Sequence, residues 1–227
     1  MRRVRILYHC ISARSFRPLW TLEELELTYQ IVMLPFPPRA CSPEYMGINP
    51  LGTVPAYIDG TTRMTESSAI CEFIAMRHSL GDLAVAPDES EYGVYLNWVH
   101  FGEATLTFPQ TLVLRYGRFE PIDRQLPQVV QDYSRWFLSR LRGVERKISS
   151  HRYLCADRFT VADISVGYAL MLAGYLGLSD RFPDAVRAYW AELQERDGFK
   201  KALAAQEKAA VEQGVSTTPA PLTAPLQ

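Results

Sequence analysis

The spacing of apolar and polar residues changes its period near residue 90. Before that point, short runs rich in branched and aromatic residues predict strands over 4–8, 29–34 and 56–58, with helices over 16–27 and 67–78. Asp59-Gly60 is a turn signal that joins 56–58 to a further strand over 61–65 as a hairpin. This order of elements predicts an α/β domain over residues 1–80, followed by a linker that reaches residue 90.

From residue 91 onward the apolar residues recur at helical spacing, which predicts an all-helical domain over residues 91–210. The expected helices cover 92–116, 124–149, 160–178, 183–195 and 198–210. Pro109 predicts a kink in the first of them. The last stretch, 211–227, is rich in Pro and Thr and lacks periodicity, so we expect a disordered tail there.

One helix start in this half is strongly marked. Thr160-Val161-Ala162-Asp163 fits a capping box, in which the Thr160 hydroxyl and the Asp163 carboxylate each accept from backbone N–H groups of the first turn. The helix continues through 164–178, an apolar run without charged residues. This run is shorter than the roughly 20 residues that a membrane span needs. We therefore predict a central core helix and no membrane segment.

The chain is organised around residues 49–68, NPLGTVPAYIDGTTRMTESS. Val54-Pro55 stands at the head of a strand, where a cis bond is tolerated and would leave the Val54 N–H and C=O facing outward. Glu66-Ser67 begins an apolar helix, and free N–H groups beside a hydroxyl suit a carboxylate. The two pieces predict a clamp for a small peptide-like ligand. The alternatives are an ordinary turn at Val54-Pro55 and an acidic first turn with an N-cap at Glu66-Ser67.

The composition limits the kinds of partner that the chain is expected to bind. With 24 Lys+Arg against 25 Asp+Glu and no basic cluster, the chain lacks the footprint of a nucleic-acid or lipid-headgroup surface. The apolar run at the N-terminus is too short for an export signal, so we expect a cytoplasmic protein. The four cysteines form no C-x-x-C pair, which predicts neither a metal site nor a disulfide framework.

Four segments together resemble one known family. YHCISARSFRPLWTLEELEL, NPLGTVPAYIDG, TESSAICEFIA and FTVADISVGYAL lie in the order and at the intervals seen in cytosolic glutathione S-transferases, especially bacterial members. The resemblance covers residues 4 to 208. It implies a thioredoxin-like N-terminal domain that binds glutathione as co-substrate, and an all-helical C-terminal domain that shapes the second-substrate pocket. It also implies a homodimer.

The resemblance assigns roles to the clamp. In the family the Val-Pro bond is cis and the backbone there pairs with the cysteinyl part of glutathione, which falls to Val54 and Pro55. The Glu-Ser pair holds the γ-glutamyl end, here Glu66 and Ser67. Thr53 is a further candidate for ligand contact. A Ser, Cys or Tyr near the end of the first strand, or in the loop after it, activates the thiol.

The group that activates the thiol is chosen on chemical grounds. A free thiol has a pKa of about 8.5, so the site must stabilise the thiolate, for which a helix N-terminus and a hydroxyl donor act together. We choose Ser12, because Ser15 is expected to cap the first helix. In several subgroups the functional residue aligns with Ala13 or Arg14, so the Arg14 guanidinium or the Ala13 N–H is an alternative. Cys10 as a nucleophile would instead give thiol-disulfide reduction.

The second-substrate pocket has weaker signals. His100, Glu103 and Thr107 fall on one helical stripe, which either lines a cleft or is a solvated or subunit-facing stripe. Tyr8 adds a hydroxyl near the end of the first strand. We expect a glutathione S-transferase that attacks a hydrophobic electrophilic small molecule. The alternatives are a glutathione-dependent isomerase, ether-cleaving or disulfide-reducing enzyme, and a non-catalytic interaction module.

Overall fold

The computed structural model describes residues 4–79 and 82–223, which form two compact units. The first, here called the N-terminal unit, combines residues up to Ser79 with Glu195–Ala220. The second, here called the helical unit, comprises the described residues between 82 and Gln194, together with those from Pro221 onward. The chain therefore leaves the N-terminal unit and returns to it near its end.

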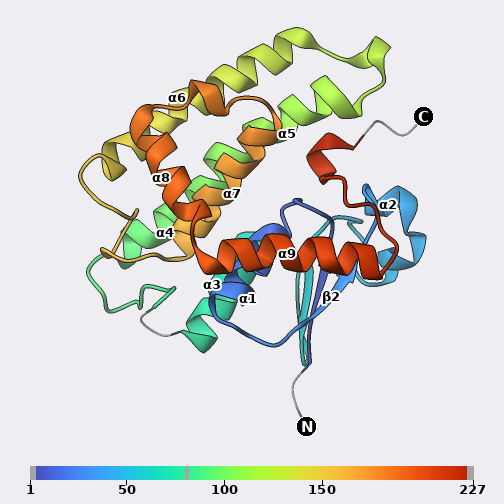
Figure 1. The fold of residues 1–227 in the computed structure, drawn as a ribbon, viewed down its shortest axis with the longest axis horizontal. Helices are drawn as coiled ribbons and strands as arrows, with labels where there is room; N and C mark the ends of the chain where they lie inside the picture. Colours follow the sequence, from blue (N-terminus) through green and yellow to red (C-terminus); the bar gives the residue numbers. More distant parts are fainter. Residues whose placement is uncertain (1–3, 80–81, 224–227) are drawn as a thin grey trace. The chain divides into compact units, whose positions relative to one another are not determined.

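A four-stranded mixed sheet forms the centre of the N-terminal unit (Figure 1). Its strands are β1 (Arg5–His9), β2 (Gln30–Met33), β3 (Ala56–Asp59) and β4 (Thr62–Met64). Their order is β2-β1-β3-β4, with β1 parallel to β2 and the other neighbours antiparallel. The predicted hairpin is confirmed, with Gly60 at φ 64° in its turn.

Helices pack beside this sheet. They are α1 (Phe16–Glu24), α3 (Ser67–His78) and α9 (Asp197–Glu212). Between β2 and β3 lie two short helical segments, α2 (Pro38–Cys41) and η1 (Pro43–Gly47). Pro18 is the third residue of α1. The prediction that Ser15 caps α1 through its side chain is wrong, because its hydroxyl accepts from the Cys10 N–H at 3.4 Å instead.

Helix α9 packs against α1 and lies near β2 (Figure 1). The Phe199 ring meets the rings of Phe16 and Trp20 edge-on, at centroid distances of 5.5 and 4.9 Å. Apolar burial of this kind fixes α9 to the N-terminal unit. The structure thus differs from the predicted boundary, which gave residues 195–210 to the helical domain, because periodicity reports the helix but not the surface that it covers.

The prediction of a disordered tail over residues 211–227 is wrong for its described part, which makes regular contacts. Val215 continues from α9 with its N–H on the Ala210 carbonyl, and Ala220 begins a short turn, η6 (Ala220–Leu222). Ala220 is buried, and its N–H donates to the Ile11 carbonyl at 2.8 Å. Residues 224–227 lie outside the described part.

The helical unit is built on one long helical run followed by three helices. The run comprises α4 (Tyr92–His100), η2 (Phe101–Thr107), α5 (Phe108–Leu114) and η3 (Arg115–Phe119), with η2 and η3 as π-helical turns. After the short turn η4 (Ile122–Arg124) come α6 (Pro127–Ile148), α7 (Val161–Tyr175), the turn η5 (Ser179–Arg181) and α8 (Asp184–Gln194). Pro109 is the second residue of α5, which follows η2.

Helix α7 is the buried centre of this unit, as its apolar sequence predicts. It packs against α4 and η2. The approach is closest at Gly102, where an added Cβ would lie 2.6 Å from the Ser165 backbone carbon. Only glycine allows two helix backbones to come this near, so Gly102 sets the spacing between η2 and α7.

The predicted capping box at the start of α7 is confirmed. Asp163 Oδ2 accepts from the Thr160 N–H at 2.9 Å, and Thr160 Oγ1 accepts from the Ala162 N–H at 3.2 Å. The other carboxylate oxygen, Oδ1, accepts from the Leu154 N–H and the Tyr189 hydroxyl. One buried carboxylate therefore joins α7, α8 and the loop before α7.

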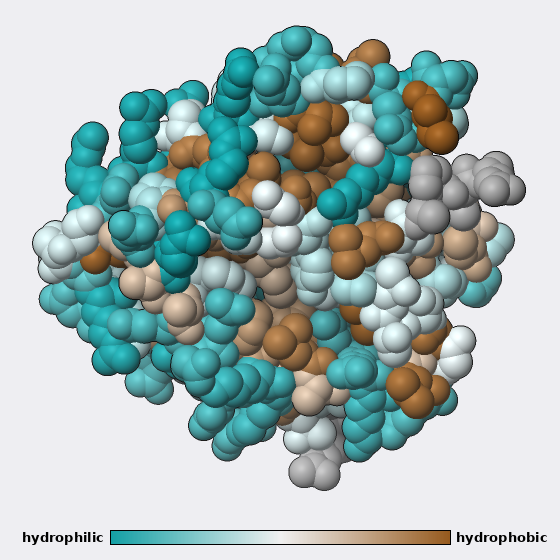
Figure 2. Space-filling model, turned by 45° about the horizontal axis from the view of Figure 1, so that its top comes forward, coloured by the Kyte–Doolittle hydropathy of each residue, from teal (hydrophilic) through white to brown (hydrophobic). Residues whose placement is uncertain are grey.

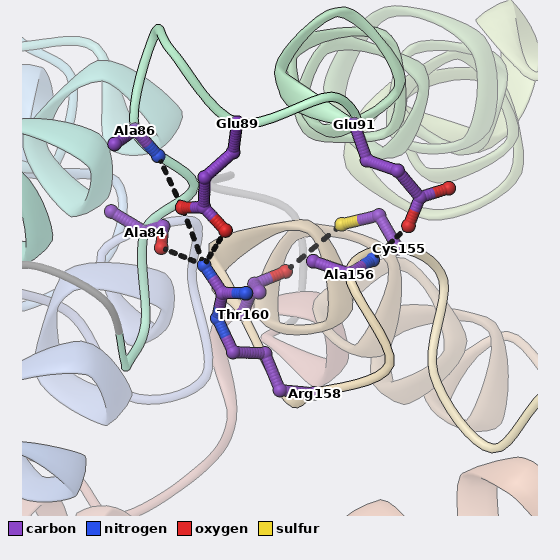
Figure 3. A network of polar contacts seen from close by, with 8 residues as sticks. All are labelled: Ala84, Ala86, Glu89, Glu91, Cys155, Ala156, Arg158 and Thr160. Carbon is purple, nitrogen blue, oxygen red and sulfur yellow. Dashed lines mark hydrogen bonds and ion pairs between the residues drawn. The ribbon is translucent and has the colours of Figure 1, made fainter.

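That loop is fixed to the segment before α4 by a second polar network (Figure 3). The Arg158 guanidinium donates to both Glu89 carboxylate oxygens at 2.8 Å and to the Ala84 carbonyl at 2.9 Å. Glu91 accepts from the Ala156 N–H. The segment predicted as a linker is therefore a structured part of the helical unit where it is described.

Within 4–79 and 82–223, no helix has the length and apolarity needed to cross a membrane. On the face shown in Figure 2, hydrophobic residues reach the surface in separate groups among hydrophilic ones. The fold class is as predicted, a thioredoxin-like N-terminal unit and an all-helical unit formed by most of the C-terminal half.

Candidate functional site

The Val54-Pro55 bond is cis, as the sequence predicts. It lies just before β3, whose pairing with β1 starts at Ala56 opposite Tyr8. Pro55 is buried and Val54 half-buried. Among the described residues we find no hydrogen bond to the Val54 N–H or C=O. An extended peptide can therefore pair with the Val54 backbone as a further strand segment.

Side chains of η1 and the loop after it hold the segment before this bond by hydrogen bonds. The Thr53 carbonyl accepts from the Tyr45 hydroxyl at 2.7 Å and from Asn49 Nδ2 at 2.8 Å. The Thr53 side chain is exposed, although Asn49 Nδ2 also reaches its hydroxyl at 3.3 Å. These bonds occupy the Thr53 carbonyl, so Thr53 can meet a ligand only through its side chain or N–H.

The other half of the clamp is the start of α3. Glu66 is the N-cap residue, with extended backbone and an exposed side chain, and its carbonyl accepts the first helical hydrogen bond, from Ile70 at 2.9 Å. Ser67 is the first helical residue and is buried. The N–H groups of the first turn have no partner within the helix, so they present partial positive charge beside the Ser67 hydroxyl.

Arg17 belongs to this site but was not predicted from the sequence. Its side chain is fully buried in α1, and Nη1 donates to Ser67 Oγ at 3.1 Å. A buried guanidinium next to a helix N-terminus adds positive charge where an anionic ligand group would lie. The signal in the sequence is a lone charge in the otherwise apolar first turns of α1, which the periodicity assigns to the core.

Ser12 lies in the loop between β1 and α1 with φ at 54°, a left-handed conformation that is unusual for a residue other than glycine. It is almost fully buried, and α9 supplies one of its partners. Gln206 Oε1 accepts from the Ser12 N–H at 2.9 Å, and Gln206 Nε2 donates to Ser12 Oγ at 3.3 Å. His9 Nε2 bonds the same Gln206 oxygen at 2.9 Å.

The charge state of this network is set by burial. Loss of hydration lowers the pKa of His9 to about 4, opposed in part by its hydrogen bond to Gln206. His9 is therefore neutral at physiological pH, with one ring proton to donate. Both Gln206 and His9 were outside the predicted site, since a contact across 194 residues leaves no local pattern.

The other candidates for thiol activation have different surroundings. The Ala13 N–H already donates to the Cys10 carbonyl at 3.1 Å, so it is engaged within the loop. Cys10 is buried, and burial raises the pKa of its thiol far above the ordinary range. Arg14 is half-buried. Tyr8 is half-buried too, and its ring lies 5.4 Å from that of Tyr45.

His100 and Thr107 do not form the predicted stripe. His100 is exposed, whereas Thr107 is fully buried and donates its hydroxyl to the Gly102 carbonyl at 2.7 Å. The prediction assumed a regular α-helix, and the π-helical turn η2 between the two residues changes their angular offset. Both residues belong to the helical unit. Across the described ranges no group of three His, Cys, Asp or Glu side chains is arranged to hold a metal ion.

Comparisons with known proteins agree with this geometry. Residues 11–77 match the family model described as the glutathione S-transferase N-terminal domain. Glutathione S-transferase 1 of Zea mays is 29% identical over 195 residues, covering 83% of this chain and 90% of the relative. Glutathione S-transferase 3 of Schizosaccharomyces pombe is 27% identical over 178 residues, covering 74% of each chain.

A solved structure gives the same result for the whole fold. The glutathione transferase URE2P6 of Phanerochaete chrysosporium, in complex with oxidized glutathione, superposes with a TM-score of 0.79 at 25% identity. The match covers 92% of this chain and 98% of that one. The similarity therefore includes both the sheet-containing unit and the helices.

Proposed function

We propose that this chain is a member of the cytosolic glutathione S-transferase family, which binds glutathione in the clamp and transfers it as a thiolate to a hydrophobic electrophile. The observation that carries the proposal is the pairing of two half-sites in one unit. The Val54 backbone is available for an extended peptide, and the start of α3 offers Ser67 and first-turn N–H groups for a carboxylate.

Glutathione fits these two half-sites by its chemistry. Its cysteinyl residue has a peptide N–H and C=O that can pair with Val54 next to Pro55. Its γ-glutamyl end has one carboxylate and one ammonium. We assign the carboxylate to Ser67, the N–H groups of α3 and the charge of Arg17, and the ammonium to the exposed carboxylate of Glu66.

The thiol is activated near the loop between β1 and α1. We assign this role to Ser12, with Arg14 as a further contact to glutathione. The thiolate sulfur attacks the electrophilic carbon, a sulfur–carbon bond forms, and the leaving group departs with its electron pair while the thiol proton goes to solvent. Tyr8 remains a proposal for the second-substrate pocket. So do the homodimer, the cytoplasmic location and the closer relationship to bacterial members.

Two measurements test the proposal. The protein should be retained on immobilised glutathione and released by free glutathione, and it should conjugate a chloronitroarene with release of chloride. Replacing Ser67 with Ala should weaken retention. The matched control is Ser150→Ala, at an exposed position in the helical unit, which should leave retention unchanged. Absence of binding at millimolar glutathione would refute the proposal.

Replacing Cys10 distinguishes disulfide reduction from conjugation. Its buried thiol, with a raised pKa, is a poor nucleophile at neutral pH. We expect Cys10→Ser to keep its conjugating activity. If that variant loses activity while its retention on glutathione is normal, a mixed disulfide through Cys10 becomes the better account.

A further inference from the structure

The balanced charge of the whole chain hides a local excess of basic residues on α6. This helix contains five Lys and Arg residues against two acids, Asp132 and Glu145. It packs against α5 and α8, and its apolar residues Phe137, Leu141 and Val144 are fully buried (Figure 1). The opposite side of the helix is exposed and includes all four of its arginines, namely Arg135, Arg140, Arg142 and Arg146.

Three of these arginines lie in one row along the helix. At about 100° per residue, Arg135, Arg142 and Arg146 fall within about 40° of one another, and at a rise of 1.5 Å per residue they span about 16 Å. We call these three residues the arginine row. Arg142 and Arg146 are four positions apart, and like charges at this spacing destabilise a helix.

The arginine row has no acidic partner among residues 4–79 and 82–223. No described carboxylate lies within ion-pair distance of any of its three guanidinium groups. Several other surface cations of this chain are paired, as Arg152 is with Glu192 and Lys201 is with Glu26. A solvated face normally mixes charges of both signs. The row departs from that pattern, as is expected where a partner supplies the missing carboxylates.

Trp136 lies on the same exposed side of α6. It is 50% exposed, although tryptophan is an apolar residue. Its ring stacks on that of Tyr133 at a centroid distance of 5.8 Å, and the Arg140 guanidinium lies 5.3 Å from the Trp136 centroid. Arg, Trp and Tyr are the residue types that contribute most to binding at protein interfaces. Because its neighbours already hold the Trp136 ring, little side-chain freedom is lost on binding.

We propose that this face of α6 binds an extended acidic segment of a partner protein, whose carboxylates pair with the arginine row and whose apolar side chain packs on Trp136. Guanidinium groups suit this partner because their donors match the two oxygens of a carboxylate. The inference does not depend on the proposed function.

Two other kinds of anionic partner fit the face less well. A helix that binds a membrane surface inserts its apolar side into the lipid, and the apolar side of α6 is in the core of the helical unit. A nucleic-acid surface makes about 6–10 phosphate contacts, whereas the row supplies three cations in a chain with a formal net charge of -1.

Fluorescence anisotropy with the full chain tests the proposal. The probe is a fluorescein-labelled peptide of about ten residues, long enough to cross the row when extended, in which Glu alternates with Ala around one central Leu. We expect saturable binding that weakens as the salt concentration rises from about 0.01 to 0.15 M. The double variant Arg142→Gln, Arg146→Gln should bind about five- to ten-fold more weakly. Trp136→Ala should also weaken binding.

Two controls separate this face from charge in general. Arg63→Gln, at an exposed position on β4, makes the same change in net charge and should leave binding unchanged. The double variant Arg142→Lys, Arg146→Lys keeps the charge but loses the paired donors, so it should recover only part of the affinity. An equal loss of binding in Arg63→Gln would overturn the inference.

Folding of the variants is checked by urea unfolding. Because the charges of Arg142 and Arg146 repel, Arg142→Gln should leave the unfolding midpoint unchanged or raise it. A clear fall would show that the arginine supports the fold, and would count against a binding role. No saturable binding of the peptide at low salt would overturn the proposal. So would tighter binding to duplex DNA or to phosphatidylserine vesicles that is lost in the same variants.

Discussion

Asp163 gives the most quantitative test of the helical unit. Its carboxylate accepts from two backbone N–H groups, those of Leu154 and Thr160, and from the Tyr189 hydroxyl. Asp163 is 0% exposed, so no water replaces a lost acceptor. In Asp163→Ala the two backbone N–H groups and the Tyr189 hydroxyl lose their acceptor, and the Thr160 hydroxyl loses a longer bond of 3.3 Å to Oδ2. At about 1–2 kcal/mol for each of the first three donors, the free energy of unfolding should fall by roughly 3–6 kcal/mol.

Asp163→Asn makes a sharper comparison, because it changes one oxygen to NH₂ at constant shape. A hydroxyl can rotate to accept, but a backbone N–H cannot. Wherever the NH₂ is placed, it faces one of the two N–H groups, so one donor is left unpaired, at a cost of about 1–3 kcal/mol. The expected order of stability is wild type, Asn, then Ala.

Urea unfolding followed by circular dichroism measures this order. Tyr189→Phe is the partner variant, since it removes one donor and should reduce the additional loss caused by Asp163→Ala in the double variant. Retention on immobilised glutathione reports separately that the N-terminal unit is folded. A loss below about 1 kcal/mol in Asp163→Ala, with an unchanged urea dependence, would contradict the hydrogen-bond account.

Further predictions concern the pH dependence of stability, one close contact between helices and the anion site. Folding lowers the pKa of His9 to about 4, so its contribution to stability is present above pH 6.5 and is lost as pH falls toward 4, by up to about 3 kcal/mol. Burial raises the pKa of Asp163 to about 6, so its contribution to stability instead declines as pH rises from about 4 through 6. Urea unfolding at several pH values measures both effects. His9→Gln should remove the loss of stability toward pH 4, and Asp163→Asn should remove the decline between pH 4 and 6. Gly102→Ala should lower the free energy of unfolding by about 1–3 kcal/mol, because the added Cβ meets the Ser165 backbone, and a midpoint equal to wild type would refute this close approach. Arg17→Met should weaken glutathione binding about ten- to hundred-fold by calorimetry, and an unchanged affinity would exclude Arg17 from the anion site.

Local patterns in the sequence predicted the elements well. Helix α3 begins and ends where expected, at Ser67 and His78, and the capping box at Thr160 and Asp163 is formed as predicted. Both rest on interactions between residues a few positions apart. A cap or an apolar period depends on residues close together in the chain, so it can be recognised directly in the sequence.

Interactions between distant residues were not predictable in this way. Gln206 reaches Ser12 across 194 positions, and Arg17 reaches Ser67 across 50. Each looked like an ordinary helical residue in its own segment. The stripe of His100 and Thr107 failed for another reason, because π-helical turns change the period on which the spacing argument depends.

The return of α9 to the N-terminal unit has a consequence for synthesis of the chain. Residues up to Ser79 leave the ribosome long before Glu195, and at roughly 5–20 residues per second the interval is about 6–23 s. During this time Phe199 does not yet cover the Phe16 and Trp20 rings of α1. The N-terminal unit therefore cannot complete its core as the first product of translation. Its final packing waits for the helical unit to be made, so a nascent chain stalled before α9 should bind chaperones through the exposed Phe16 and Trp20.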